Sequence, residues 1–167
     1  MLLKILFVFV ACSGFTGTDI SGNSDMHIFT SHELVKNYSN KENLKFINEI
    51  VTVDGGEVTW YQGGEGYTDT VVKELIQAWL VDEPIIKSER SSVSINKLME
   101  QDEYDWLHLD VEGIDGDLIL CLEQKPNVII YESMNLDQLM EAKLNLWFVE
   151  NSYETIECNG NTIAVKK

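Results

Sequence analysis

Two short apolar segments of the sequence each end in an acidic residue, and a helical pattern of apolar residues follows each of them. The first segment, WLHLD, ends at Asp110, and the second, NVIIYE, ends at Glu132. Apolar runs of this length that alternate with helices are typical of strands in a parallel sheet that helices cover on both faces. Ligands bind beyond the carboxyl ends of such strands. The sequence therefore predicts that Asp110 and Glu132 point into one crevice.

The same alternation of strand-like and helix-like periods extends through most of the chain. Thr30 and Glu33 form a capping-box pattern before a first helix. Ser94 has the position of a helix cap, as does Thr68 or Asp69 before the clearest helical pattern. Helical spacing of apolar residues is found in segments 34–38, 71–80, 95–99, 116–124 and 136–147. This order of elements predicts an α/β fold with an open, mostly parallel sheet.

Two pairs of β-rich runs are separated by turn residues. In LKFINEIVTVDGGEVTWYQGG the runs lie on either side of Asp54, Gly55 and Gly56, which predicts a hairpin or a strand with an irregular return. In YETIECNGNTIAVKK the runs flank Asn159 and Gly160, whose tolerance of positive φ favours a type I′ turn. The chain is therefore expected to end in an antiparallel hairpin at the edge of the sheet.

The N-terminal segment MLLKILFVFVACSGFTG fits two interpretations. A lysine, a short apolar run and small residues are the pattern of a cleaved secretory signal. The apolar run 5–11 followed by a glycine turn is also typical of a buried parallel strand, which we prefer. The segment is too short for a transmembrane span. We therefore distinguish a strand or signal-like segment with a glycine-rich loop at 1–26 from a domain at 27–167.

Composition excludes some partners. The formal net charge is −16 with 12 Lys and Arg residues, whereas contact with a nucleic acid backbone needs clustered basic side chains, so we expect no nucleic acid partner. The length of the N-terminal apolar segment leads us to expect no stable membrane insertion. Cys12, Cys121 and Cys158 lack CxxC spacing and indicate neither a disulfide framework nor a zinc site. We expect a cytoplasmic location, with export as the alternative if segment 1–17 is a signal.

Three stretches, DWLHLDVEGIDGDLI, KPNVIIYESMN and WFVENSYETIECNGNTIAVKK, occur in an order that resembles the C-terminal half of the FkbM-type methyltransferases. These enzymes use S-adenosylmethionine and mostly methylate hydroxyl groups. The stretch FINEIVTVDGGEVTWY resembles the middle portion of the family, so the likeness covers roughly residues 27–167. The resemblance implies a Rossmann-like class I methyltransferase fold, with the cofactor across the carboxyl ends of the first strands and the acceptor near the fourth.

Individual residues carry the resemblance. Asp110, Glu112 and Gly113 match the Asp-Val-Glu-Gly motif of the family, and Glu132 matches the acid that ends the next strand. His108 stands where the family tends to have a basic residue, usually Lys. The match implies that the acceptor half of a methyltransferase site is present.

The cofactor half departs from the family. Its glycine-rich loop after the first strand is represented only by CSGFTG, in which Gly14 and Gly17 permit close approach of the backbone to a ligand. Asp19 and Asn48 complete the candidates for cofactor contacts. Where the family has an acid for the ribose hydroxyls, this chain has Thr30. The loop is too short for the helix expected there, since an average helix takes about eleven residues. The cofactor half is therefore expected to be truncated or rebuilt.

Methyl transfer from a sulfonium to a hydroxyl needs aligned reactants and a base. His108 and Asp110 lie on one side of an extended strand and, with Glu132, are the candidate catalytic residues. Asp110 and Glu132 are alternatively a pair of ligands for a divalent cation, although no dedicated metal motif is present. A further alternative is that Asp110 and Glu112 cap the following turn and helix.

Two functions are compatible with these residues. The first is an S-adenosylmethionine-dependent O-methyltransferase that acts on a small-molecule or carbohydrate acceptor. The second is a non-catalytic remnant of the methyltransferase fold that serves as a binding module for a carbohydrate or protein partner.

Overall fold

The computed structural model describes residues 4–9, 25–29, 44–47, 49–62, 69–80 and 84–167. The four candidates for cofactor contacts lie outside these residues, as does the helix predicted after Thr30; the candidates are Gly14, Gly17, Asp19 and Asn48.

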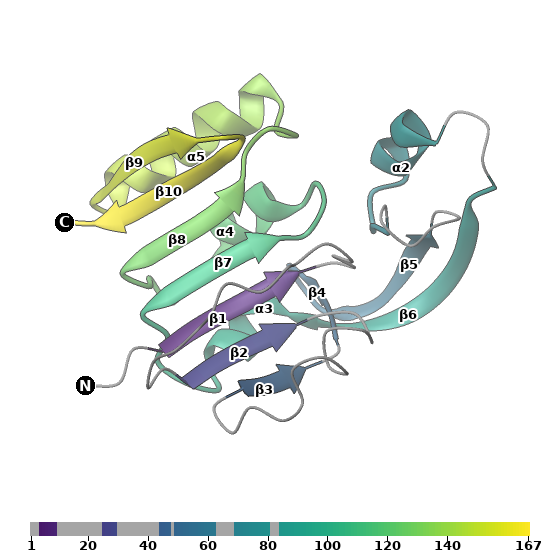
Figure 1. Ribbon diagram of the computed structural model, residues 1–167, viewed down its shortest axis with the longest axis horizontal. Helices are drawn as coiled ribbons and strands as arrows, with labels where there is room; N and C mark the ends of the chain where they lie inside the picture. Colours follow the sequence, from purple (N-terminus) through teal and green to yellow (C-terminus); the bar gives the residue numbers. More distant parts are fainter. Residues whose placement is uncertain (1–3, 10–24, 30–43, 48, 63–68, 81–83) are drawn as a thin grey trace.

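A seven-stranded sheet forms the larger part of the molecule, with the strand order β3-β2-β1-β7-β8-β10-β9 (Figure 1). Its strands are β1 (Lys4–Phe9), β2 (Asp25–Phe29), β3 (Leu44–Ile47), β7 (Trp106–Asp110), β8 (Val128–Glu132), β9 (Tyr153–Cys158) and β10 (Asn161–Lys166). The pairs of β1 with β2, β2 with β3, β1 with β7 and β7 with β8 are parallel, whereas β10 is antiparallel to both of its neighbours. Along the chain, β2 and β3 are added on one side of β1, and the later strands β7 and β8 are added on its other side. A topological switch point therefore lies between β1 and β7.

The N-terminal segment contributes the strand β1 at the centre of this sheet, as the strand interpretation predicted for the part of the segment that the structure describes. The C-terminal hairpin is also confirmed. Asn159 and Gly160 have φ angles of 50° and 83°, which are the two positive values that a type I′ turn requires. The hairpin places β9 at the edge of the sheet and inserts β10 between β8 and β9.

A second sheet has the order β4-β6-β5 and consists of β4 (Ile50–Thr52), β5 (Gly56–Gln62) and β6 (Ile86–Ser94). A hairpin between β4 and β5 was one of the two predictions for this segment, and it is wrong, because β6 lies between the two strands. The turn at Asp54 and Gly55 is therefore an irregular return. Beside β5 lies the short helix α2 (Lys73–Trp79), which begins without a side-chain cap. Asp69 does not cap it but is buried and accepts a hydrogen bond from Gln62.

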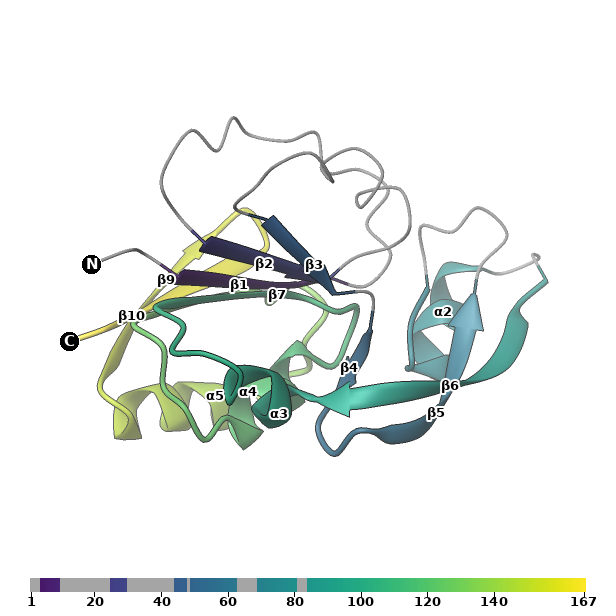
Figure 2. The ribbon, with the colours of Figure 1, turned by 90° about the horizontal axis from the view of Figure 1, so that it is seen from below.

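Three helices cover the seven-stranded sheet, namely α3 (Ile95–Met99), α4 (Asp115–Cys121) and α5 (Gln138–Glu150). All three lie on the same face of the sheet (Figure 2). Among the described residues no helix covers the other face, so the predicted coverage of both faces is not found there. The predicted cap of α3 is confirmed, since the Ser94 hydroxyl accepts a hydrogen bond from the Lys97 N–H at 3.3 Å. None of the helices in the described part of the chain is both long and apolar enough to cross a membrane.

The core lies between the sheet and these helices. Leu107 and Leu109 of β7 and Ile129 of β8 are fully buried and belong to one apolar cluster with side chains of α4 and α5. The Phe148 ring of α5 stacks on Tyr131 of β8 with 5.8 Å between the ring centroids. The molecule is therefore an α/β protein with two mixed sheets, of which the larger carries most of the core.

Candidate functional site

Asp110 and Glu132 lie side by side at the carboxyl ends of β7 and β8. The parallel register pairs Leu109 with Tyr131, so the next residues along the two strands are these two acids. Neighbouring strands are about 4.8 Å apart, which brings both carboxylates to the same edge of the sheet. Both side chains are half-buried. The structure thus brings together the two acids that the sequence predicted at one crevice.

His108 shares a face of β7 with Asp110. Leu107 and Leu109 are fully buried toward the helices, so the alternating residues of the strand point to the opposite face. Burial lowers the pKa of His108, while the nearby Asp110 carboxylate acts in the opposite direction. The imidazole is therefore uncharged at neutral pH and able to accept a proton.

The loop after β7 turns sharply through two positive φ angles, 52° at Glu112 and 99° at Gly113. A positive φ is unusual for a glutamate and marks a backbone that its surroundings hold in place. Helix α4 then begins after Ile114 without a side-chain cap, so the alternative in which Asp110 and Glu112 cap this helix is not found. The Asp115 side chain is buried, and the backbone N–H groups of Asp115 and Val111 favour its charged form, while its Oδ1 atom has no hydrogen-bond partner among the described residues.

The segment before α2 holds this loop from the other side. The Thr70 hydroxyl donates a hydrogen bond to the Glu112 carbonyl oxygen at 2.8 Å and accepts one from the Val72 N–H at 3.0 Å. A Cβ atom on Gly113 would lie 2.8 Å from Leu75 Cδ2. Only glycine fits both the backbone angle and the contact, so the Glu112–Gly113 turn is fixed by its neighbours.

Four carboxylates gather around the ends of β7 and β8, namely Asp110, Glu112, Asp115 and Glu132. Burial raises the pKa of Glu112 to about 7, and the charges of Glu132, Asp110 and Asp115 add to the shift. Burial also raises the pKa of Asp115 to about 7, with the Asp110 carboxylate as the next contribution. Groups with a pKa near neutral pH are suited to proton transfer and are a frequent mark of functional sites.

Glu132 belongs to the same electrostatic group. Its pKa is raised by burial and by Asp110, and lowered by a hydrogen bond that the Asn135 amide donates to its Oε2 at 2.8 Å. Asn135 thereby orients the Glu132 carboxylate. A positively charged ligand at this edge of the sheet would relieve the repulsion between the acids.

Metal binding at the site stays a prediction. Within the described ranges, no group of three or more His, Cys, Asp or Glu side chains is placed to hold a metal ion. The pair of Asp110 and Glu132 retains the oxygen ligands that a magnesium ion prefers, but the structure adds no third side chain from this part of the chain.

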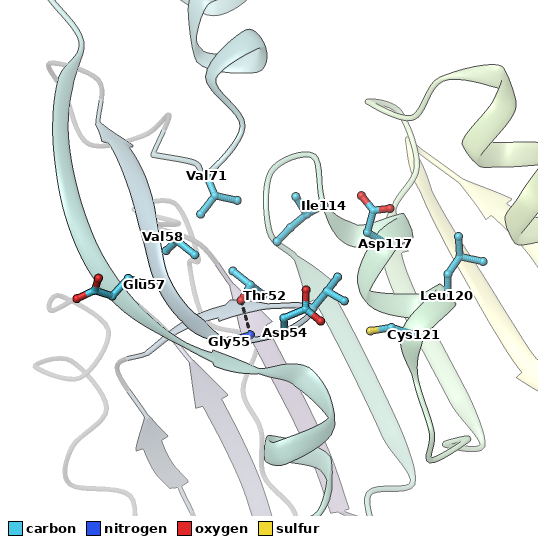
Figure 3. A pocket seen from close by; sticks show the side chains of 11 residues that line it. Thr52, Asp54, Gly55, Glu57, Val58, Val71, Ile114, Asp117, Leu120 and Cys121 are labelled. Carbon is cyan, nitrogen blue, oxygen red and sulfur yellow. Dashed lines mark hydrogen bonds between the residues drawn. The ribbon is translucent and has the colours of Figure 1, made fainter.

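Sequence reasoning missed two features of this region. The first feature is the raised pKa values of Glu112 and Asp115. The sequence DVEGID has three acids around a glycine, which indicates mutual repulsion, but the burial of Glu112 and Asp115 becomes evident only in the folded chain. The second feature is a cavity of about 700 Å³ between α4 and the three-stranded sheet (Figure 3). It is lined by elements far apart in the sequence.

The fold and the site together define an α/β protein whose larger sheet has a topological switch point between β1 and β7 and carries clustered carboxylates at the carboxyl ends of β7 and β8. Comparisons of the chain with protein families, with curated proteins and with solved structures found no match.

Proposed function

We propose that this protein is an S-adenosylmethionine-dependent methyltransferase of the FkbM type that transfers a methyl group to a hydroxyl of a small molecule or sugar. The observation that carries the proposal is the adjacent placement of Asp110 and Glu132 at the carboxyl ends of β7 and β8. Both ends lie on the carboxyl side of the parallel strands, next to the topological switch point between β1 and β7, where ligands of open α/β folds bind. The terminal antiparallel hairpin is compatible with the class I methyltransferase fold that the sequence resemblance implies.

The described residues suit a positively charged cofactor. S-adenosylmethionine carries a sulfonium and an ammonium group, and the four clustered carboxylates favour positive charge at this edge of the sheet. When bound, the cofactor supplies a methyl group on a positively charged sulfur. Its other contacts are assigned by the sequence to Gly14, Gly17, Asp19 and Asn48, which lie outside the described residues.

The chain's own groups then have distinct tasks. Asp110 takes the proton from the acceptor hydroxyl as the oxygen becomes a nucleophile, and the uncharged His108 on the same face of β7 is the alternative base. Glu132, oriented by Asn135, accepts a hydrogen bond from the acceptor and fixes its position.

Calorimetric titration of the full-length chain with S-adenosylmethionine tests the cofactor half of the proposal. We expect binding by the wild type, loss of binding in Gly14→Val, whose side chain prevents close backbone approach, and retained binding in the exposed control Glu103→Gln. A wild-type chain that binds no S-adenosylmethionine would contradict the proposal and favour the non-catalytic binding module.

Formation of S-adenosylhomocysteine with a panel of alcohols and sugars tests the acceptor half. Removal of a general base lowers turnover by about 10²–10⁴-fold, so Asp110→Asn should lose turnover to this extent even when S-adenosylmethionine is saturating. Asp110→Asn that keeps full turnover would assign the base to another residue, and His108→Gln is then the decisive variant.

A further inference from the structure

An open cavity of about 700 Å³ lies between helix α4 and the three-stranded sheet (Figure 3), and the carboxylates at the ends of β7 and β8 are not among the residues that line it. Its volume is within the range of small-molecule sites, roughly 300–1,000 Å³. The turn that carries Asp54 forms one side of the cavity, and Ile114, Asp117 and Leu120 of the α4 region form the opposite side. All residues that line this cavity belong to the described part of the chain.

The lining combines apolar walls with acidic groups. Val58, Val71, Ile114 and Leu120 are half-buried residues of the lining, and Val58 and Val71 lie across the cavity from Ile114 in Figure 3. Three carboxylates, those of Asp54, Glu57 and Asp117, belong to exposed residues of the lining, and no lysine, arginine or histidine is among the residues that line the cavity. A lining of half-buried apolar residues and exposed carboxylates is complementary to a molecule that has an apolar body and a positive charge.

The carboxylates of Asp54 and Asp117 both act on the thiol of Cys121, which also lines the cavity. Burial raises its pKa, and the charges of Asp54 and Asp117 contribute in the same direction, from opposite sides of the cavity. The two carboxylates therefore act on one region of space. The Cys121 Sγ donates a hydrogen bond to the Leu118 carbonyl at 3.1 Å, which holds the thiol against its own helix.

Hydrogen bonds fix the wall that carries Asp54. The Thr52 hydroxyl contacts the Ser92 hydroxyl at 2.9 Å and accepts a hydrogen bond from the Gly55 N–H at 3.0 Å. The Ser92 hydroxyl in turn contacts the Gly56 carbonyl oxygen at 3.0 Å. Gly55 has a φ of 73°, and a Cβ there would lie 2.9 Å from the Ser94 nitrogen. The turn is therefore held in one shape before any ligand binds.

The opposite wall is fixed in a similar way. The Asn96 amide of α3 donates to the Cys121 carbonyl oxygen at 2.8 Å, and its Oδ1 accepts from the Glu123 N–H at 2.9 Å, so the end of α4 is anchored. Thr70, next to Val71 in the lining, is bonded to the loop that leads into α4. A cavity whose walls are fixed in this way does not need to reorganise to receive a ligand, which favours binding.

We propose that this cavity binds an amphipathic organic cation, with the apolar part of the ligand against Val58, Val71, Ile114 and Leu120 and its ammonium group between Asp54 and Asp117. This site is separate from the methyltransferase proposal, because it requires neither S-adenosylmethionine nor Asp110. Its ligand class is defined by one positive charge on an aromatic or aliphatic body.

The test is a pair of probes of nearly equal size, 2-phenylethylammonium and 2-phenylethanol, titrated into the ¹⁵N-labelled full-length chain and followed by amide chemical shifts. We expect saturable shifts at Val58, Ile114 and Leu120 with the ammonium probe, and binding at least about fivefold weaker with the alcohol, as expected for the loss of one or two partly exposed ion pairs. Equal binding of the two probes, or no localised shifts at millimolar ammonium, would overturn the proposal.

Charge variants test whether the ammonium probe binds to the carboxylates of the cavity or is attracted only by the overall negative charge of the chain. Asp54→Asn and Asp117→Asn should each weaken the ammonium probe about two- to fivefold, and the double variant about tenfold. Glu103→Gln removes the same charge from an exposed residue outside the lining and should leave the affinity unchanged. An effect of Glu103→Gln equal to that of Asp117→Asn would contradict a specific site.

Variants with a larger side chain in the cavity provide a second, independent test. Leu120→Trp and Val58→Trp fill the cavity from opposite walls and should each abolish binding, whereas Leu139→Trp enlarges an exposed side chain on α5 and should not. The isosteric charge variants keep the proposal testable if a filling variant does not fold. Undiminished binding in a folded Leu120→Trp protein would place the ligand elsewhere and overturn the proposal.

Discussion

The two sheets of this protein are built on different physical principles. In the seven-stranded sheet, β7 alternates half-buried and fully buried residues and packs Leu107 and Leu109 into the core. In the three-stranded sheet, the central strand β6 has the sequence IKSERSSVS, and most of its side chains are exposed. Only Val51 and Trp60 of the three strands are buried apolar residues. Hydrophobic burial thus holds the first sheet, and backbone pairing with polar contacts such as Thr59 to Glu89 holds much of the second.

The difference between the two sheets determines how rigidly each of them holds the acidic side chains that we propose to be functional. Asp110 and Glu132 extend from buried strands, so their spacing is fixed by the core. The turn that carries Asp54 depends instead on hydrogen bonds between hydroxyl and backbone groups. We therefore expect Asp110 and Glu132 to keep their relative positions under conditions that already loosen the three-stranded sheet.

The largest expected effect comes from the core of the seven-stranded sheet. Phe148 is 1% exposed and stacks against Tyr131, so Phe148→Ala should lower the free energy of unfolding by about 3–5 kcal/mol. Trp60→Ala in the smaller sheet should cost less than half of that, because a region with few buried groups opens locally. Urea denaturation measures both, and equal losses would remove the distinction between the two sheets.

The next largest effect is a pH dependence of stability that comes from Asp115 at the start of α4. Burial raises the pKa of Asp115 from 3.8 to about 7, so its contribution to stability is complete below pH 4 and is lost as the pH rises toward 7. The lost contribution is roughly 2–4 kcal/mol. Asp115→Asn should make the dependence between pH 4 and pH 8 shallower and leave the part that comes from Glu112, whereas Asp117→Asn, exposed on the same helix, should not change it. Denaturation at a series of pH values measures this, and parallel curves for Asp115→Asn and the wild type would contradict it.

A glycine pair tests the contact between the two regions. Gly113 and Gly56 both have positive φ, 99° and 95°, but a Cβ would contact Leu75 only at Gly113. Gly56→Ala should therefore report backbone strain alone, about 1–2 kcal/mol, and Gly113→Ala should cost about 1 kcal/mol more. Thermal unfolding measures the difference. Identical costs would mean that the contact between α2 and the loop after β7 does not constrain that loop.

The smallest effect concerns the junction between β6 and α3. Ser94 ends β6 and caps α3 through the Lys97 N–H, so Ser94→Ala should lower stability by about 1 kcal/mol. Asp137→Ala, which removes the corresponding cap of α5, is the matched variant in the larger region. Calorimetric melting compares the two. No loss in Ser94→Ala would show that α3 is held by its neighbours and not by its cap.

Local patterns in the sequence predicted much of the seven-stranded sheet. The strand ends at Asp110 and Glu132, the cap at Ser94 and the turn at Asn159 and Gly160 depend on residues within a few positions of each other, and each occurs as the sequence indicated. The type I′ turn in particular follows from residue chemistry alone, because Asn and Gly tolerate positive φ.

The features that were missed depend on contacts between distant residues. The pairing of β6 with both β4 and β5 could not be predicted, because the polar run of β6 has no alternation that marks a buried face. The hairpin that was one of the two expectations around Gly55 failed for the same reason, since the true partners lie between 24 residues (Gln62 with Ile86) and 42 residues (Ile50 with Ser92) apart in sequence. Likewise, the pKa of Asp115 depends on burial that only the folded chain produces.

Amide hydrogen exchange of the full-length chain, with and without S-adenosylmethionine, tests most directly whether the carboxyl ends of β7 and β8 bind this cofactor. We predict slower exchange at residues 111–113 and 133–134 in the presence of S-adenosylmethionine, and unchanged exchange in β5 and β6. Identical exchange in the loops after β7 and β8 in the two samples would contradict a cofactor crevice at this edge of the sheet.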